Sequence, residues 1–243
     1  MSSDLILVHG LFRLADASAA RDTDADNVRR SRAFAEFGSA LGVRDYDCVD
    51  GSKKAMANRL LRLARGTAPA VDAVEIIGLD AASFRASLRE ESTRARWREM
   101  ASCAPYGFDA SRSFILIGAP LQLLEGSADG QRVIWFGRGL AELSEAEFVA
   151  HYTGRHGPLV AGYAKHLGLR RYRQVPAGEA ALCEALRELG LGQASAPAVF
   201  AELVVGPPRL TLASLRARRQ ATREIKIDEQ RHIDFQRSML LLA

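Results

Sequence analysis

The chain has 243 residues, of which 48% are hydrophobic and 26% charged, so it can form one large or two smaller domains with sizeable cores. Its formal net charge is +4, and the arginines alternate with glutamates along the expected helices, which argues against a nucleic-acid-binding surface. The three cysteines lie far apart without CxxC spacing, which argues against a zinc ribbon or a disulfide framework and favours a reducing compartment. Because we find no signal-peptide pattern and no apolar run long enough to span a bilayer, we expect a cytoplasmic protein without a membrane partner.

The expected elements follow the same order in two halves of the chain. Strands are predicted from β-branched and apolar enrichment, and helices from length and 3.6-residue periodicity. The first half gives a strand at 4–12, a helix at 25–41, a strand at 43–49, a short helix at 53–65, a strand at 71–78, a helix at 81–102 and a strand at 112–118. The second half gives a strand at 131–137, a helix at 144–166, a strand at 169–175, a short helix at 178–189, a strand at 198–205, a helix at 210–224 and a strand at 237–242. Without the short helices, each half has the β-α-β-β-α-β order of a ferredoxin-like unit.

Sequence similarity between the halves points to an internal duplication. The segment "LGVRDYDCV" at 41–49 matches "LGLRRYRQV" at 167–175, and two further pairs, 71–88 with 199–215 and 112–117 with 237–242, follow at nearly the same offset. We therefore predict an α+β protein of two ferredoxin-like halves, 1–122 and 129–243, whose sheets cover each other in an α/β barrel. A small apolar ligand would bind between the sheet and the helices of a half. The duplication could complete the barrel within one chain, which leaves a homodimer open.

The N-terminal stretch "LILVHGLF" resembles the strand and His-Gly turn of α/β hydrolases. That family needs a G-x-S-x-G nucleophile elbow, which the sequence lacks, so we set the hydrolase interpretation aside. In the repeat alignment His9 instead corresponds to Trp135, in the middle of the first strand of each half. His9 is then either a core histidine or one that faces the ligand.

The segment "HYTGRHGPLV" at 151–160 follows a predicted helix start, because "SEAE" at 144–147 has the pattern of a capping box. Phe148, Tyr152, Leu159 and Tyr163 recur at helical spacing and should face the sheet. Pro158, with a glycine on each side of His156, should kink or restart the helix there.

Its two histidines differ in their expected roles. His151 and His156 are five residues apart, about 140° around an α-helix, whereas metal-binding pairs prefer spacings of three or four, so we predict no metal site. His151, like His166, is expected to be exposed. His156 lies on the inward face near the helix end, where burial lowers and the helix dipole raises its pKa, which suits general acid or base catalysis. The alternative is a structural histidine that bonds to a carbonyl freed by the proline.

The stretch "LSEAEFVAHYTGRHGPLV" at 143–160 resembles the signature of EthD-like proteins, which belong to the dimeric α/β-barrel superfamily. The first half has Arg30 in place of His156 and Arg32 in place of Pro158, so only the second copy retains the signature. The resemblance implies a paired ferredoxin-like fold with a pocket for an apolar, often aromatic or polyketide-like molecule. Related proteins include cofactor-independent cyclases, dehydratases, isomerases and oxygenases as well as accessory proteins, and His156 corresponds to the signature histidine.

Further residues complete the predicted site. Tyr152 could orient His156 or stack on an aromatic substrate, and His232 precedes the last strand, at a position that commonly lines such pockets. Arg138 could bind a phenolate or carboxylate. The substrate-binding candidates are His9, Trp135, Arg138, Phe148, Tyr163 and, in the corresponding loop of the first half, Tyr106.

The predicted function is that of a cofactor-independent lyase or isomerase that acts on a hydrophobic aromatic molecule, with catalytic residues His156, Tyr152 and His232. Neither GxGxxG nor GxxxxGK[ST] occurs, so nucleotide cofactors are not expected. Two alternatives remain open: a non-catalytic binding or accessory protein for an apolar metabolite, and a monooxygenase that is cofactor-free or uses haem, because some relatives bind haem through a histidine.

Overall fold

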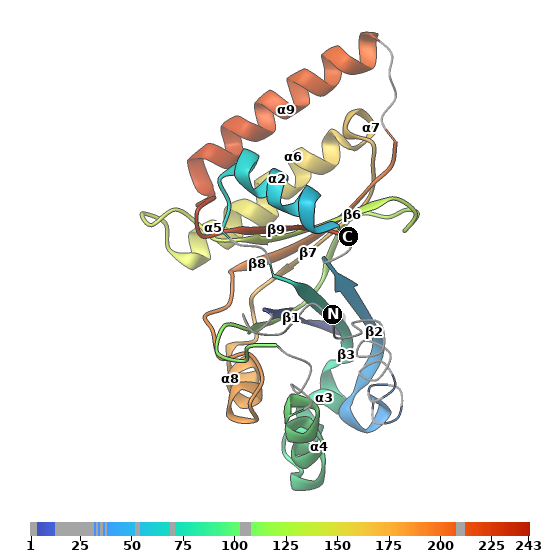
Figure 1. Ribbon diagram of the computed structural model, residues 1–243, viewed down its shortest axis with the longest axis vertical. Coiled ribbons are helices and arrows are strands. Elements are labelled where there is room, and N and C mark those ends of the chain that lie inside the picture. Colours follow the sequence, from blue (N-terminus) through green and yellow to red (C-terminus); the bar gives the residue numbers. More distant parts are fainter. Residues whose placement is uncertain are drawn as a thin grey trace. The chain divides into compact units, whose positions relative to one another are not determined.

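The computed structural model describes residues 4–12, 32, 34, 36, 38–51, 54–68, 71–102, 108–207 and 212–243 (Figure 1). No helix in these ranges is both long and apolar enough to cross a membrane. The chain forms two compact units. Unit 1 contains Met1–Ser52, Val71–Ala119 and Ala177–Ala196, and unit 2 contains Lys53–Ala70, Pro120–Pro176 and Pro197–Ala243. Each half of the chain therefore gives one short segment to the unit formed mainly by the other half.

Unit 1 is a four-stranded antiparallel sheet with helices packed on one face. Its core joins Leu7 and Ile77 of the sheet to Phe84, Trp97 and Leu186 of the helices. The strands, β1 (Asp4–Leu11), β2 (Val43–Asp50), β3 (Ala73–Asp80) and β4 (Phe114–Gly118), have the order β2-β3-β1-β4, and the helices are α3 (Ala81–Ser87), α4 (Glu91–Ser102) and α8 (Ala180–Glu188).

Unit 2 is a five-stranded antiparallel sheet whose helices also cover one face (Figure 1). Trp135, Tyr172 and Leu240 of the sheet pack with Phe148 and Tyr152 of the helical layer. The strands, β5 (Leu121–Leu124), β6 (Gln131–Gly137), β7 (Leu169–Pro176), β8 (Val199–Val205) and β9 (Met239–Leu242), have the order β5-β7-β8-β6-β9. The helices are α2 (Ala55–Arg65), α5 (Glu145–His151), the π-helix η3 (Tyr152–His156), α6 (Gly157–Gly162), α7 (Ala164–Leu167) and α9 (Leu212–His232).

The two sheets share local features as well as strand order. Without β5, the order β7-β8-β6-β9 repeats β2-β3-β1-β4. Gly42 and Gly168, at φ 76° and 73°, end a helix before β2 and β7, a left-handed position that favours glycine. Each of these strands then has an irregularity in its pairing, between Val43 and Asp45 and between Leu169 and Arg171. Both units thus have ferredoxin-like strand order, but no closed barrel is found among the described strands.

Three elements differ from the sequence-based prediction. The helix expected at 81–102 is divided into α3 and α4. The Ser87 hydroxyl donates to the Phe84 carbonyl at the end of α3, and the Thr93 hydroxyl of α4 donates to the carbonyl of Glu90 between the two helices. Such side-chain bonds compete with a continuous helix. Strand β5 was not predicted and extends the second sheet beyond β7. Helix α9 continues to His232 rather than ending near 224, and most of the helix expected at 25–41 lies outside the described residues.

Candidate functional site

The motif segment 144–162 is a helix with a widened turn at its centre. The Ser144 hydroxyl accepts from the Glu147 N–H and the Glu147 carboxylate accepts from the Ser144 N–H, so the predicted capping box is confirmed. The Gly157 N–H bonds to the Tyr152 carbonyl, five residues back, in place of the α-helical four. Because Pro158 has no N–H to donate, the α-helical ladder cannot continue through this turn, and the structure relaxes it into η3.

The π-turn brings the two histidines of the motif onto one carboxylate. In a π-helix residues five apart follow one another on the same side, so the 140° separation expected for an α-helix does not apply. His151 Nε2 lies 3.1 Å from Asp228 Oδ1, and His156 Nδ1 lies 3.0 Å from Asp228 Oδ2. Both histidines therefore meet α9 through Asp228, and the expectation of an exposed, separate His151 is wrong.

Asp228 is a buried carboxylate with several donors around it. It is 6% exposed, and Arg155 Nε adds a longer contact of 3.5 Å to Oδ1. Burial by itself would raise the pKa of Asp228, but the hydrogen bonds from His151 and His156 outweigh it, and the pKa lies below its usual value. Asp228 is thus a carboxylate anion at neutral pH, held by two imidazoles.

His156 has one ring nitrogen held by Asp228 and the other without a hydrogen-bond partner among the described residues. His156 is 5% exposed. Burial lowers the pKa of its imidazole, although the hydrogen bond to Asp228 acts in the opposite direction. The ring is therefore neutral at pH 7, and since Asp228 is ionised, we assign the proton to Nδ1, as its donor. Nε2 then carries the free electron pair, has no hydrogen-bond partner among the described residues and is not fully enclosed. A neutral imidazole with a fixed tautomer and a free Nε2 can remove a proton from a bound molecule.

Aromatic and amide groups of the unit 2 interior continue from His156 through Tyr152. The Tyr152 ring lies 4.8 Å from the His156 ring. Gln174 Nε2 donates to the Tyr172 hydroxyl at 2.5 Å. Burial raises the pKa of both tyrosines, so both stay protonated and neither is a base at neutral pH. Two buried polar atoms, Gln174 Oε1 and Trp135 Nε1, have no partner among the described residues; buried polar atoms normally bond to protein, water or ligand.

His232 contributes by stacking. As the last residue of α9 it bonds through Nδ1 to the Asp228 carbonyl at 3.1 Å. Its ring stacks on that of His151, with centroids 3.3 Å apart and planes 10° apart. His232 is therefore joined to the site through His151 and through the Asp228 backbone.

A metal ion is the obvious alternative for such a cluster. His151, Asp228 and His232 offer ligand atoms within 4.8 Å of one another. However, the lone pairs of stacked imidazoles lie in nearly parallel planes, whereas two ligands of one ion must point toward a common centre. Arg155 also brings a positive charge to the same carboxylate. The arrangement fits a hydrogen-bonded cluster better than a metal centre.

The other predicted residues occupy different surroundings. Phe148 is fully buried against Tyr152, and Trp135 is buried against Phe235. The Tyr163 hydroxyl donates to Glu224 of α9, so this ring end does not face the sheet. Arg138, half-buried after β6, has its pKa lowered by burial and by Arg237. Tyr106 lies outside the described residues.

His9 belongs to unit 1 and forms a cluster of its own. His9 Nδ1 lies 2.9 Å from Glu75 Oε2 of the neighbouring strand, and the Tyr46 hydroxyl donates to Glu75 Oε1 at 2.8 Å. His9 Nε2 is fully buried and has no partner among the described residues. The structure therefore places His9 in the interior of unit 1, next to a carboxylate that the sequence did not indicate.

Sequence reasoning missed Asp228, the group that organises the site. The prediction ended the last helix near 224, so Asp228 and His232 were assigned to a loop. Their spacing of four residues, in a stretch without glycine or proline up to Ile233, was the available signal for a continuing helix with both side chains on one face. The contribution of His151 depended on the π-turn, which α-helical geometry could not indicate.

All the residues around Asp228 fall in one recognisable segment. An EthD domain matches residues 140–236. This confirms the resemblance inferred from residues 143–160 and extends it through α9, so His151, His156 and Asp228 all lie within the EthD domain. No curated protein sequence matches the chain.

Two solved structures show a similar chain trace at low sequence identity. A mutant chlorite dismutase from Candidatus Nitrospira defluvii has a TM-score of 0.47 and 10% identity, over 100% of this chain and 92% of that chain. A protein from Thermus thermophilus described as a novel heme-binding protein has a TM-score of 0.46 and 14% identity, over 98% of this chain and 90% of that chain. Similarity at this level carries no argument about the function of the EthD-domain protein.

Proposed function

We propose that the EthD domain is a cofactor-independent catalytic domain in which His156 transfers a proton to or from a hydrophobic, aromatic small molecule. The observation that carries the proposal is the His156–Asp228 pair: the carboxylate holds Nδ1 at 3.0 Å and leaves Nε2 without a partner. A base can start eliminations, isomerisations and cyclisations by removing a proton from carbon or oxygen, so the reaction class in this proposal is that of a lyase or isomerase.

The surrounding groups have positioning roles in this proposal. Asp228 fixes the tautomer of His156 and stabilises the imidazolium that forms when Nε2 takes up a proton, as carboxylates do for catalytic histidines elsewhere. The Tyr152 ring, 4.8 Å from His156, limits the rotation of the imidazole. Trp135 Nε1 and Gln174 Oε1 are a buried donor and a buried acceptor that a polar substituent of the substrate could satisfy.

A general probe can test the base before the substrate is known. Removal of the ring C–H proton of a nitro-substituted benzisoxazole breaks its N–O bond and gives a coloured cyanophenolate, without any oxidant or cofactor. We expect the full chain to accelerate this reaction and His156→Ala to lower the rate about 10²- to 10⁴-fold, the usual contribution of a general base. His166→Ala, which removes an exposed histidine of α7, is the matched control and should leave the rate unchanged.

The binding-protein alternative makes a different prediction from the same variants. If His156→Ala, with an unchanged circular dichroism spectrum, reduces the rate less than tenfold, His156 is not the base. If an aromatic ligand binds to both proteins with equal affinity and neither turns over any probe, the accessory function replaces the enzymatic one.

A haem function would use the same histidine, because an axial ligand also needs a free Nε2 and a held Nδ1. The residues do not fit this group as they stand. A macrocycle centred on Nε2 needs open space around the ring, and His156 is 5% exposed with the Tyr152 ring 4.8 Å away. Haem therefore has no part in the proposed reaction. A Soret band in the purified protein that His156→Ala abolishes would reverse this conclusion.

We also propose that the two units arose by tandem duplication, with the motif kept only in the second copy. The shared strand order, the paired glycines Gly42 and Gly168, and the matching irregularities in β2 and β7 support it.

A further inference from the structure

Large apolar side chains exposed on the surface concentrate on two helices of unit 2. Among the described residues, six such side chains are exposed, and all but Leu121 lie on α2 or α9: Met56, Leu60, Leu63, Leu215 and Ile227. Single exposed apolar residues are ordinary, but a cluster on adjoining elements marks an interaction surface.

Helix α2 presents three of them on one stripe. Met56, Leu60 and Leu63 are spaced four and three residues apart and are 73%, 60% and 69% exposed. The opposite face is anchored, because the side chain of Asn58 exchanges two hydrogen bonds with the backbone of Leu242 in β9. With three arginines and no acidic residue, α2 is a basic amphipathic helix whose apolar stripe faces away from the sheet.

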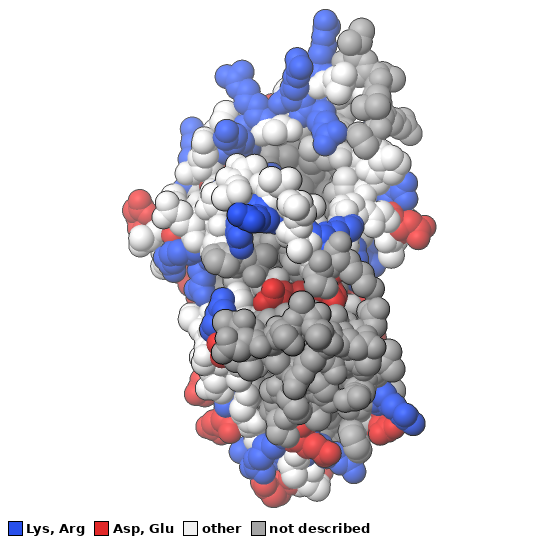
Figure 2. Space-filling model, in the orientation of Figure 1, with Lys and Arg blue, Asp and Glu red and all other residues white. Residues whose placement is uncertain are grey.

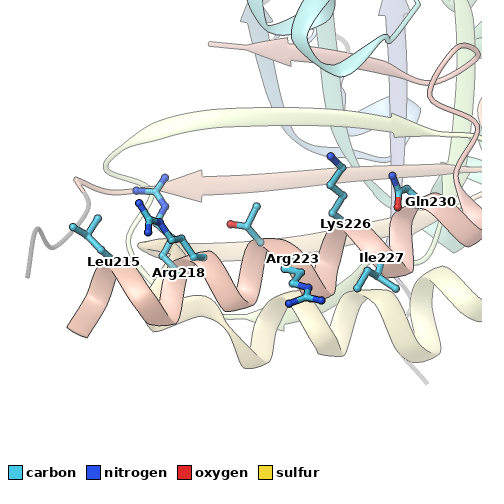
Figure 3. Close-up of a pocket in the computed structure, with 8 residues that line it drawn as sticks. Leu215, Arg218, Arg223, Lys226, Ile227 and Gln230 are labelled. Carbon is cyan, nitrogen blue, oxygen red and sulfur yellow. The ribbon is translucent and has the colours of Figure 1, made fainter. Parts of the chain in front are cut away.

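Helix α9 supplies a cationic groove of about 540 Å³ (Figure 3). Leu215 lies at one end and Ile227 near the other, about 18 Å apart along the helix axis, and Gln230 follows Ile227. Between Leu215 and Ile227 the groove is lined by Arg218, Arg219, Thr222, Arg223 and Lys226. Figure 2 shows lysine and arginine side chains gathered over α9.

The charge of this groove is not neutralised within the described part of the chain. The ion pairs of α9 use Asp228 and Glu229, and none involves the four cations of the groove. Glu224, the acidic residue between them, is engaged by Tyr163 and Gln220. The two helices also adjoin: Arg65 of α2 pairs with Glu229 of α9 at 3.1 Å.

We propose that α2 and α9 of unit 2 together bind the surface of an anionic phospholipid bilayer. Apolar side chains at the membrane interface enter the acyl boundary while neighbouring cations pair with phosphate groups, the pattern of interfacial basic helices. This surface goes beyond the proposed proton transfer and replaces the sequence-based expectation of no membrane partner.

Two other anionic partners fit the surface less well. Proteins that bind single-stranded nucleic acid without sequence preference stack the bases on aromatic side chains. Neither α2 nor α9 contains an aromatic residue other than His232. One small anion would need its cations to converge, whereas these are distributed along successive turns of a single helix.

Vesicle sedimentation with the full chain tests the proposal. We expect the protein to pellet with vesicles of equal parts phosphatidylcholine and phosphatidylglycerol, to bind far less to phosphatidylcholine alone, and to dissociate as salt increases. Arg218→Glu with Arg223→Glu should lower the partition coefficient at least about 10-fold. Leu60→Ser with Leu63→Ser should also lower it, and should leave a weaker binding that salt abolishes.

The control carries the same change in net charge elsewhere: Arg89→Glu with Lys165→Glu, both at exposed positions, should bind as the unmodified chain does. Circular dichroism and turnover of the benzisoxazole probe check that each variant is folded, independently of lipid. The proposal fails if the protein binds no vesicles or binds neutral and anionic vesicles equally. It also fails if the partition coefficient of the control falls as far as that of the arginine variant, or if duplex DNA binds as tightly as anionic vesicles. It also fails if the protein self-associates without lipid and Leu60→Ser with Leu63→Ser abolishes that, because a second copy then covers the stripe.

Discussion

His156 in unit 2 and His9 in unit 1 are both buried histidines whose Nδ1 atoms lie 3.0 Å and 2.9 Å from a carboxylate. They differ in the second nitrogen: Nε2 of His9 is fully enclosed without a partner, whereas Nε2 of His156 is not. They differ also in their supports, because His9 is held within a regular sheet and His156 on a π-turn between two helices. The two pairs therefore differ in the property that the proposed proton transfer needs, which is access to the second ring nitrogen.

Isosteric amides at the two carboxylates should separate the pairs most clearly. Asp228→Asn removes the charge that fixes the His156 tautomer, and we expect benzisoxazole turnover to fall about 10²-fold or more. Glu75→Gln makes the matching change next to His9 and should leave turnover unchanged. An equal loss in both variants would mean that the rate reports on folding and not on the base.

The two glycines of the motif test the role of the π-turn. A methyl group on Gly157 would lie 2.6 Å from Leu123 Cδ1 and 2.7 Å from Gln174 Nε2, so Gly157→Ala should lower the free energy of unfolding by about 1–3 kcal/mol. At Gly154 nothing lies within 4 Å, so Gly154→Ala should be neutral or stabilise by up to about 1 kcal/mol. Urea denaturation of both variants measures the difference. Equal effects would show that the turn tolerates a side chain on its sheet side.

The smallest effect is on pH dependence. Burial lowers the pKa of His156, although the negative charges of Asp228 and Glu229 act in the opposite direction. The ring therefore stays neutral at pH values somewhat below the ordinary histidine pKa of about 6.5. Turnover by the neutral base should therefore persist on mild acidification and decline only as the pH falls through this lowered pKa.

Stability should change in the same direction. At a pH between the ordinary pKa of the unfolded chain and the lowered pKa of folded His156, the unfolded chain binds a proton that the folded chain does not. The contribution of His156 to stability is therefore present above about pH 6.5 and is lost as the pH falls. His156→Gln should flatten this dependence in urea titrations, whereas His166→Gln should not. An acid limb of turnover above that of a free imidazole would contradict the assigned pKa direction.

Local patterns in the sequence were sufficient for much of the fold. The capping box at Ser144, the glycines before β2 and β7, and most of the alternating strands and helices depend on neighbouring residues alone. His156 was selected from its place on the inward face before Pro158 together with the resemblance of residues 143–160 to EthD-like proteins. These features need no knowledge of distant parts of the chain.

The remainder depends on contacts between distant segments. Asp228 lies 72 residues beyond His156, and nothing in its own surroundings in sequence indicates a buried carboxylate. The prediction placed His151 and His156 on different sides of an α-helix. It was wrong because the proline widens the turn between them into a π-helix. Glu75 was hidden in an apolar strand, where only the pairing with His9 explains its presence.

The exchange of short segments between the units affects how the protein can be synthesised. The side chain of Asn58 in α2 forms two hydrogen bonds with the backbone of Leu242, which lies 184 residues later in the chain. At a translation rate of about 5–20 residues per second, α2 leaves the ribosome roughly 10–40 s before the strand that holds it. During that interval the opposite side of α2, where Leu61 packs on the core of unit 2, has no β9 to cover it. The helix therefore gains its place on the sheet only after the last strand has been synthesised.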